Sequence, residues 1–139
     1  MPFAPCLGVK DTATSKAFYE QLGFVVDSQT ATDDDDIHMV LFDGQFCGML
    51  YRYAHLESWL PSLKEQPVGF TGMFYLEVRN FEEMLEKCTA ATEIVKGPMT
   101  DHTGTRMFYI ADPDGYVIGI NDADSRADSD LVGQYNNQA

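Results

Sequence analysis

Hydrophobic and polar positions along the chain form one pattern that occurs twice. In each half, an apolar strand is followed by a polar residue suited to cap a helix, then by an amphipathic helix and several further strands. Val9-Lys10-Asp11 in the first half corresponds to Val78-Arg79-Asn80 in the second, an offset of 78 − 9 = 69 residues in a chain of 139. A repeat of this period predicts two fused copies of one supersecondary unit.

The first half predicts a strand, a helix and three more strands. Asp11 or Thr12 can cap the helix, and Gly23 supplies the positive φ that ends it. Three apolar residues form the predicted buried stripe of this helix: Ala17, Phe18 and Leu22. Asp43-Gly44 lies between two apolar runs and predicts a tight hairpin turn. The strands are predicted over residues 6–9, 24–26, 37–42 and 45–53.

The second half predicts the same order of elements. Its helix carries four apolar residues at i, i+3, i+4 and i+7, namely Phe81, Met84, Leu85 and Cys88. Asn80 and Glu83 have the spacing of a capping box at its start. Asp112-Pro113-Asp114-Gly115 lies between two apolar runs and predicts a second hairpin. The strands are predicted over residues 73–78, 94–95, 106–111 and 116–120.

The length of the chain is typical of one domain with a single core. Within it we expect a first module over about residues 3–54 and a second over about 71–121. The connection over 55–70 contains a predicted short helix over 56–63, interrupted near Pro61. Residues 122–139 are polar and acidic, so we expect a mobile tail.

The net charge of −13 bears on which partners the protein can have. Nucleic acid and anionic membranes are excluded, because the chain lacks the basic stripe that would neutralise phosphates. Surface acid can attract a cationic ligand, or it can simply keep the protein soluble. The chain shows neither a signal peptide nor an apolar run long enough to span a bilayer, so we expect a cytoplasmic protein. Three cysteines at wide spacing in apolar sequence predict buried, reduced thiols: Cys6, Cys47 and Cys88.

Two motifs give the chain a family resemblance over residues 4–121. Phe18-Tyr19 followed by Leu22-Gly23-Phe24, paired with the later Asp-Pro-Asp-Gly hairpin, is similar to the vicinal oxygen chelate superfamily. That superfamily includes glyoxalase I, extradiol dioxygenases, fosfomycin-resistance enzymes and bleomycin-resistance proteins. The resemblance implies an α+β fold in which two βαβββ modules form a curled mixed sheet around a central cavity, with the helices outside. It also implies a homodimer, but it leaves the activity open, because this fold serves many functions.

Metal-dependent members of the superfamily place histidine, glutamine or glutamate on the first and last strands of each module. Here those positions fall on or beside Ala4 and Met73, near Met49 or Tyr51, and on Gly119. Methyl, thioether and hydrogen are absent or poor ligands for a hard divalent ion, so we expect neither a metal nor a cofactor nor a catalytic residue of the inherited kind. A relocated metal site is the alternative, and it would draw on four other side chains: Glu77, His38, His55 and His102. We interpret Asp33-Asp34-Asp35-Asp36 as a solvated loop.

The strands predicted to face the cavity carry large aromatic and sulfur-containing side chains. Such groups suit planar or cationic organic molecules, although they can equally fill a core. The predicted ligand-binding residues are Met39, Met49, Tyr51, Tyr53, Trp59, Met73, Tyr75, Glu77 and Tyr109. The resulting hypothesis is a metal-free small-molecule-binding protein of the bleomycin-resistance type, which confers antibiotic resistance by sequestering an aromatic or cationic ligand. The alternative is a divergent metal-dependent glyoxalase-like lyase or dioxygenase with relocated ligands.

Overall fold

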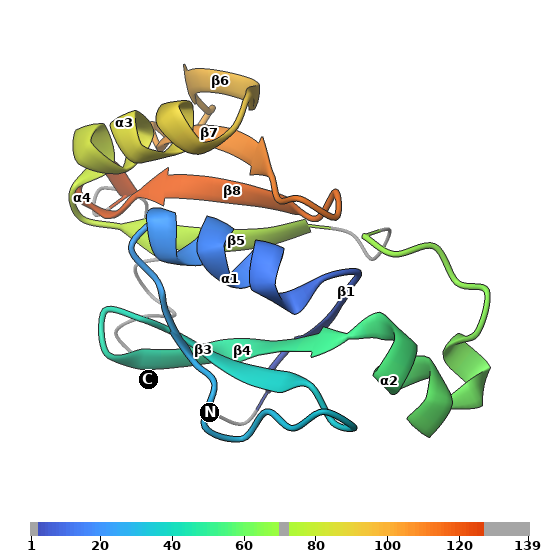
Figure 1. The fold of residues 1–139 in the computed structure, drawn as a ribbon. Coiled ribbons are helices and arrows are strands. Elements are labelled where there is room, and N and C mark those ends of the chain that lie inside the picture. Colours follow the sequence, from blue (N-terminus) through green and yellow to red (C-terminus); the bar gives the residue numbers. More distant parts are fainter. Residues whose placement is uncertain (1–2, 70–72, 127–139) are drawn as a thin grey trace. The chain divides into compact units, whose positions relative to one another are not determined.

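A computed structural model of the protein describes residues 3–69 and 73–126 (Figure 1). The chain divides into two compact units. The first unit contains the described residues up to 69 together with 112–116, and the second contains 73–111 and 117–126. Each unit is described by itself below.

The first unit is built on a mixed four-stranded sheet in the order β1-β4-β3-β2. Its strands are β1 (Cys6–Val9), β2 (Val25–Asp27), β3 (Ile37–Phe42) and β4 (Gln45–Arg52). Strand β1 runs parallel to β4, and the other two pairings are antiparallel. The predicted hairpin between β3 and β4 is confirmed, because Asp43 and Gly44 both have positive φ, at 52° and 76°.

Helix α1 (Thr12–Gln21) begins as predicted at Asp11, whose side chain accepts a hydrogen bond from the backbone N–H of Ala13 at 3.3 Å. The predicted buried stripe is partly wrong. Ala17 is exposed and Tyr19 is buried in its place, beside Phe18 and Leu22. Tyr19 is drawn inward by edge-to-face contacts with Phe18 and Phe24 at centroid distances of 5.3 Å, so its ring belongs to the core.

The connection after the first sheet is more helical than predicted. Helix α2 (Tyr53–Trp59) begins three residues before the expected start, and a 3₁₀ turn, η1 (Pro61–Leu63), follows it. Strand β4 therefore ends at Arg52. Within α2 no residue is fully buried, and its first turn receives no side-chain cap. This helix therefore lies on the surface of the first unit.

The second unit repeats the topology of the first, with strand order β5-β8-β7-β6. Its strands are β5 (Met73–Val78), β6 (Ile94–Thr100), β7 (Arg106–Ala111) and β8 (Val117–Asp122), and its helices are α3 (Phe81–Ala91) and α4 (Ala123–Arg126). Strand β5 is parallel to β8. The repeat predicted from the sequence is thus confirmed as two βαβββ modules. Strand β6 is five residues longer than predicted, and β8 continues to Asp122, inside the segment expected to be a tail.

Helix α3 buries the face that its sequence predicts. Phe81, Met84 and Cys88 are buried, and Phe81 meets Phe108 of β7 edge-on at 5.3 Å. The predicted capping box is wrong, because the Asn80 side chain caps no backbone N–H and instead donates its amide to the Glu83 carboxylate. The helix is thus held mainly by its apolar face.

The Asp-Pro-Asp-Gly turn between β7 and β8 belongs to the first unit, where it binds α1. The hydroxyl of Tyr19 donates to Asp112 Oδ2 at 2.7 Å in a buried hydrogen bond. Asp114 accepts from the backbone N–H of Lys10 at 2.9 Å and from the Ser15 hydroxyl at 3.3 Å. The two motifs that carry the family resemblance are therefore joined by hydrogen bonds, which explains why they occur together.

Three further sequence predictions concern the chain as a whole. The three cysteines carry free thiols, as expected, but only Cys88 is buried; Cys6 is exposed and Cys47 is half-buried. Among the helices of residues 3–69 and 73–126, none combines the length and the apolar character that a membrane crossing requires. The predicted mobility of the tail falls on residues that, beyond 126, lie outside the described part of the chain.

Candidate functional site

An open cleft of about 770 Å³ lies on the first unit, between the loop that precedes β3 and helix α2. Six residues line it: Asp34, Asp35, Tyr51, His55, Ser58 and Trp59. The loop contributes the two aspartates, the end of β4 contributes the tyrosine, and α2 contributes the other three. Helix α2 continues directly from β4, and the loop leads into β3, which pairs with β4. The side chains of α2 are therefore placed opposite the loop.

The aromatic part of the cleft comes from Tyr51 and Trp59. Trp59 is the last residue of α2 and remains 74% exposed, which is unusual for so large an apolar ring. Tyr51 donates its hydroxyl to the Asp35 carboxylate. That hydrogen bond is the main cause that raises the pKa of Tyr51 to about 12, so the phenol stays protonated at neutral pH.

The acidic part of the cleft consists of Asp34 and Asp35. Within the described residues neither carboxylate forms an ion pair with lysine, arginine or histidine. Asp35 is positioned by its backbone, whose N–H donates to the Thr32 hydroxyl at 2.9 Å and whose carbonyl accepts from the N–H groups of Thr32 and Ile37 at 3.0 Å. The loop thus presents two negative charges beside exposed aromatic surface.

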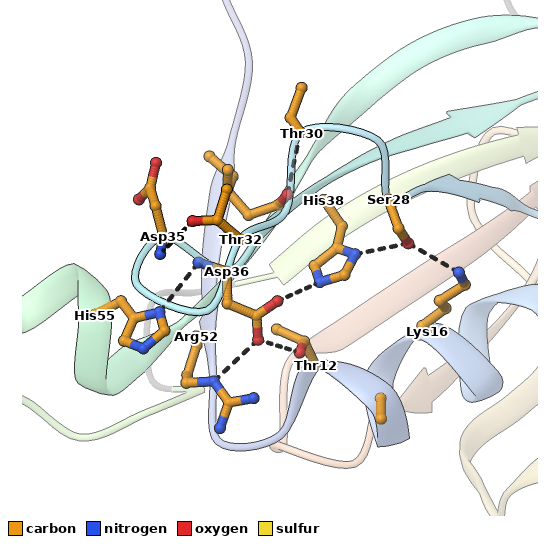
Figure 2. Close-up of polar contacts among 12 residues, drawn as sticks. Thr12, Lys16, Ser28, Thr30, Thr32, Asp35, Asp36, His38, Arg52 and His55 are labelled. Carbon is orange, nitrogen blue, oxygen red and sulfur yellow. Dashed lines mark hydrogen bonds and ion pairs between the residues drawn. The ribbon is translucent and has the colours of Figure 1, made fainter.

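Behind the cleft, Asp36 anchors the loop to the body of the unit (Figure 2). Its carboxylate accepts hydrogen bonds from Thr12 Oγ1 at 2.5 Å, His38 Nε2 at 2.7 Å and Arg52 Nε at 2.9 Å. Burial opposes ionisation of this side chain, which is 12% exposed, but the three hydrogen bonds outweigh burial and lower the pKa of Asp36. The residue therefore joins the loop to α1, β3 and β4 as an anion.

His38 continues this network away from the cleft. Its Nδ1 lies 2.8 Å from the Ser28 hydroxyl, to which Lys16 also donates at 2.8 Å (Figure 2). Both ring nitrogens of the buried His38 are consequently occupied by protein partners. His38 thus serves as a structural link between the start of the loop and Asp36.

His55 joins the two walls of the cleft. Its Nδ1 accepts a hydrogen bond from the backbone N–H of Asp36 at 3.0 Å, so helix α2 is tied to the loop (Figure 2). The sequence places His55 in the connection and makes it a candidate ligand of a relocated metal site, but it does not identify this partner. The contact could be found only after the chain was folded, because residues 36 and 55 are far apart in the sequence.

Of the predicted ligand-binding residues that belong to the first unit, Tyr51 and Trp59 lie in the cleft. Met39 and Met49 are direct neighbours across β3 and β4, and neither lines the cleft. Tyr53 begins α2, where its hydroxyl donates to the carbonyls of Leu63 and Gln66 in the connection. Gly8 makes room for the Tyr53 ring, since a Cβ there would lie 2.6 Å from Cδ2 of that ring.

The residues predicted in the second module share one face of the second unit. Met73, Tyr75 and Glu77 alternate along β5, and Met73 and Tyr75 are 42% and 58% exposed. The Tyr75 and Tyr109 rings meet edge-on at 6.2 Å above Gly119, which pairs with both residues in the sheet. A Cβ at position 119 would lie 2.7 Å from the Tyr75 ring. The position at which the resemblance predicts a metal ligand is thus covered by tyrosine. The central cavity expected between the modules, and the roles of these residues in ligand binding, stay predictions.

The four side chains considered for a relocated metal site divide between the units, with His38 and His55 in the first and Glu77 and His102 in the second. His38 and His55 each bind protein groups through Nδ1, and His102 lies exposed in the turn before β7. Across residues 3–69 and 73–126 no group of three or more histidine, cysteine, aspartate or glutamate side chains is arranged to hold a metal ion. The expectation of a metal-free protein stays a prediction.

Sequence reasoning missed four residues of the cleft: Asp34, Asp35, His55 and Ser58. The run of aspartates is interpreted from sequence as a solvated loop. The signal that could have pointed to the cleft is the position of this loop between two strands of the same module, near the connection that carries Trp59. Connections between strands run over the surface and often carry binding residues, so adjacent carboxylates in this one are candidates for contact with a ligand.

Comparisons with known proteins agree with the modular topology. The chain is similar in structure to a bleomycin-binding protein complexed with bleomycin, with 19% identity, a TM-score of 0.61 and coverage of 86% of this chain and 96% of that one. It is similar to TnmS3, an antibiotic-binding protein from Streptomyces sp. CB03234, with 23% identity, a TM-score of 0.66 and coverage of 86% and 92%. A glyoxalase/bleomycin resistance protein/dioxygenase family enzyme from Burkholderia phytofirmans PsJN gives 18% identity, a TM-score of 0.71 and coverage of 86% and 95%.

A comparison with curated protein sequences finds no match. The family model that describes the Glyoxalase/Bleomycin resistance protein/Dioxygenase superfamily matches residues 3–120. This match covers both βαβββ modules, including the Phe-Tyr motif of α1 and the Asp-Pro-Asp-Gly turn that binds it. The chain therefore belongs to the Glyoxalase/Bleomycin resistance protein/Dioxygenase superfamily.

Proposed function

We propose that this protein binds and sequesters a small organic cation with an aromatic ring, and that the cleft of the first unit holds it. The observation that carries the proposal is the meeting of exposed Trp59 with two carboxylates, Asp34 and Asp35, that lack ion-pair partners among the described residues. A volume of about 770 Å³ lies in the range of small-molecule sites.

The chemistry of the cleft favours a cation over an anion or a purely apolar ligand. An indole face attracts a positive charge through its quadrupole, and nearby carboxylates add direct Coulomb attraction. Tyr51 holds Asp35 in place by its hydroxyl and presents the rest of its ring to the cleft. A planar cation can therefore stack on the aromatic surface while its charge faces the loop.

We propose sequestration without catalysis or bound metal. Two observations support this choice. The Tyr75 ring covers Gly119, where the resemblance predicts a metal ligand, and both ring nitrogens of His38 are hydrogen-bonded, to Asp36 and to Ser28. The neighbours that bind bleomycin and another antibiotic support a role in holding an organic molecule. The proposal includes a homodimer, which sedimentation velocity at several protein concentrations would test.

The test is isothermal titration calorimetry with matched ligands. N-methylquinolinium combines a fixed charge with an aromatic ring, quinoline provides the ring without the charge, and tetramethylammonium provides the charge without the ring. Bleomycin joins the panel because one structural neighbour binds it. We expect N-methylquinolinium to bind more tightly than quinoline or tetramethylammonium. Trp59→Ala should weaken its binding by about two- to fivefold, since an exposed cation–π contact contributes about 0.5–1 kcal/mol.

Phe3→Ala is the matched control, because it removes an exposed aromatic ring that does not line the cleft. Its affinity for N-methylquinolinium should equal that of the parent protein. The chain contains a single tryptophan, so an NMR shift of the Trp59 indole N–H on titration reports binding at the cleft itself. The proposal fails if no member of the panel binds more tightly than about 1 mM, where binding is worth only about 4 kcal/mol. Stoichiometric metal in protein purified without chelator would also contradict it.

A further inference from the structure

We infer that His55 makes the cleft sensitive to pH, so that the protein releases its cationic ligand as the medium becomes acidic. This inference rests on the proposed function and concerns the regulation of the same site. It follows from one hydrogen bond, the one that the backbone N–H of Asp36 donates to Nδ1 of His55 at 3.0 Å.

The direction of that hydrogen bond determines the protonation of the ring. A ring nitrogen that accepts a hydrogen bond carries no proton, so His55 in this arrangement is neutral and bears its proton on Nε2. When the ring takes up a second proton, Nδ1 becomes a donor that points at another donor, and the hydrogen bond is lost. Histidine side chains ordinarily undergo this change between about pH 5 and 8.

When the bond breaks, helix α2 is the side that moves. Asp36 is held independently, because its carbonyl accepts from the backbone N–H of Arg52 at 3.0 Å and its carboxylate accepts from Thr12, His38 and Arg52. In α2, by contrast, no residue is fully buried and no side chain caps the first turn. The Tyr53 ring beside Gly8 anchors its beginning, whereas Ser58 and Trp59 lie beyond His55 at its end. Protonation of His55 therefore loosens the aromatic wall of the cleft.

The charges around His55 act in the same direction. The loop contributes the carboxylates of Asp34 and Asp35 to the cleft that His55 lines, and β4 contributes the Tyr51 hydroxyl. The Asp36 carboxylate and the Arg52 guanidinium are paired with each other at 2.9 Å. Glu57 lies on α2 itself; of the other elements packed against this helix, β1 brings only the Cys6 thiol and η1 brings no titratable side chain. An imidazolium in the cleft competes with a cationic ligand for Asp34 and Asp35. Release on acidification thus has a structural and an electrostatic cause.

The experiment compares N-methylquinolinium affinity at about pH 7.5 and pH 5.5 by calorimetry, because the charge of this probe does not change with pH. We expect the parent Kd to rise about tenfold on acidification, as expected for the loss of one hydrogen bond and a repulsive contact. Asparagine at position 55 offers a carbonyl oxygen to the Asp36 N–H at every pH. Whatever its affinity, H55N should keep its Kd within about twofold between the two conditions.

H102N is the matched control, because it removes an exposed histidine from the second unit and should retain the full pH effect. The inference is overturned if the parent Kd changes less than about twofold with pH, or if H55N changes as much as the parent. A parent protein that fails to bind the probe at about pH 7.5 overturns the proposed function as well, so the two failures are distinguishable. In ligand-free protein, the Trp59 indole resonance should move with pH in the parent and stay in place in H55N. A resonance that moves equally in both proteins would overturn the inference without reference to binding.

Discussion

At the scale of single residues, the hydroxyl of Tyr19 shows how a polar atom within the core holds two distant segments of the chain together. It donates to Asp112 Oδ2 at 2.7 Å, and both residues are buried. Tyr19→Phe should lower the free energy of unfolding by about 1–3 kcal/mol, because it leaves a buried carboxyl oxygen without this donor. Urea denaturation measures the change. Tyr75→Phe removes the hydroxyl of an exposed tyrosine and should change stability by less than about 0.5 kcal/mol; an equal loss in both variants would contradict the explanation.

The contact between Gly119 and Tyr75 gives a second prediction at this scale. Gly119→Ala places a methyl group where the Tyr75 ring now lies, and the exposed ring must turn away. We expect a loss of about 1 kcal/mol in the free energy of unfolding, at the low end for overpacking because Tyr75 is free to move toward solvent. In the Tyr75→Ala background the same substitution should cost less, because only the Tyr109 ring, 3.0 Å from the added Cβ, still opposes it; a double-mutant cycle therefore measures the clash with Tyr75. Additive losses would show that the ring is not the obstacle.

Individual residues were predicted from sequence where a local pattern determines them, and missed where the tertiary fold does. Asp43-Gly44 and Phe81 behave as predicted, because a turn and an amphipathic helix depend on neighbours in the sequence. Ala17 was placed in the core wrongly, since helical spacing alone cannot tell that the larger Tyr19 has an internal acceptor in Asp112. The role of Asp34 and Asp35 in the cleft was missed for the same reason, because the side chains opposite them belong to α2.

At the scale of elements, the loop before β3 depends on Asp36 more than on any regular structure. Its carboxylate connects the loop to α1 through Thr12 and to β4 through Arg52. Asp36→Asn should lower the free energy of unfolding by about 1–3 kcal/mol at neutral pH, because charge-assisted hydrogen bonds become neutral ones or are lost.

The pH dependence of this effect follows from the lowered pKa of Asp36. A carboxyl group whose pKa is lower in the folded state contributes stability above the unfolded value of about 3.9, and the contribution is lost as pH falls through the folded value. The difference in stability between Asp36→Asn and the parent should therefore be constant near neutrality and disappear progressively below about pH 4. Chemical denaturation over a pH series measures it. A difference that persists in strong acid would mean that the carboxylate charge is not its source.

Helix α2 shows why one element of the site was harder to predict than the repeat. It has only seven residues and none of them is fully buried, so a hydrophobic period has little length in which to show. Its position is determined instead by contacts with Gly8 and Asp36, which are distant in the chain. Helix α3, which has a strong hydrophobic period, begins at Phe81 as predicted. Helix α2, which carries Trp59, begins three residues before its predicted start.

At the scale of the whole molecule, the twofold repeat was the most predictable feature, because both halves bury the same kinds of faces. Strand orders β1-β4-β3-β2 and β5-β8-β7-β6 are the same arrangement used twice. The two halves differ in what the sheets carry toward solvent. The first unit has an acidic and aromatic cleft, whereas the exposed face of β5 carries Met73 and Tyr75. Copies of one module have thus diverged in chemistry while keeping one topology.

The net charge of −13 gives a prediction that belongs to the whole chain. An acidic protein attracts a cationic ligand over distances comparable to the Debye length, which shortens from about 30 Å at 0.01 M salt to about 8 Å at 0.15 M. The Kd for N-methylquinolinium should therefore rise severalfold between these salt concentrations, while the Kd for uncharged quinoline should stay nearly constant. Calorimetry at the two salt concentrations measures both. Equal salt dependence of the two ligands would mean that the acidic side chains, including Asp34 and Asp35, keep the protein soluble without contributing to recognition, and that any binding depends on stacking alone.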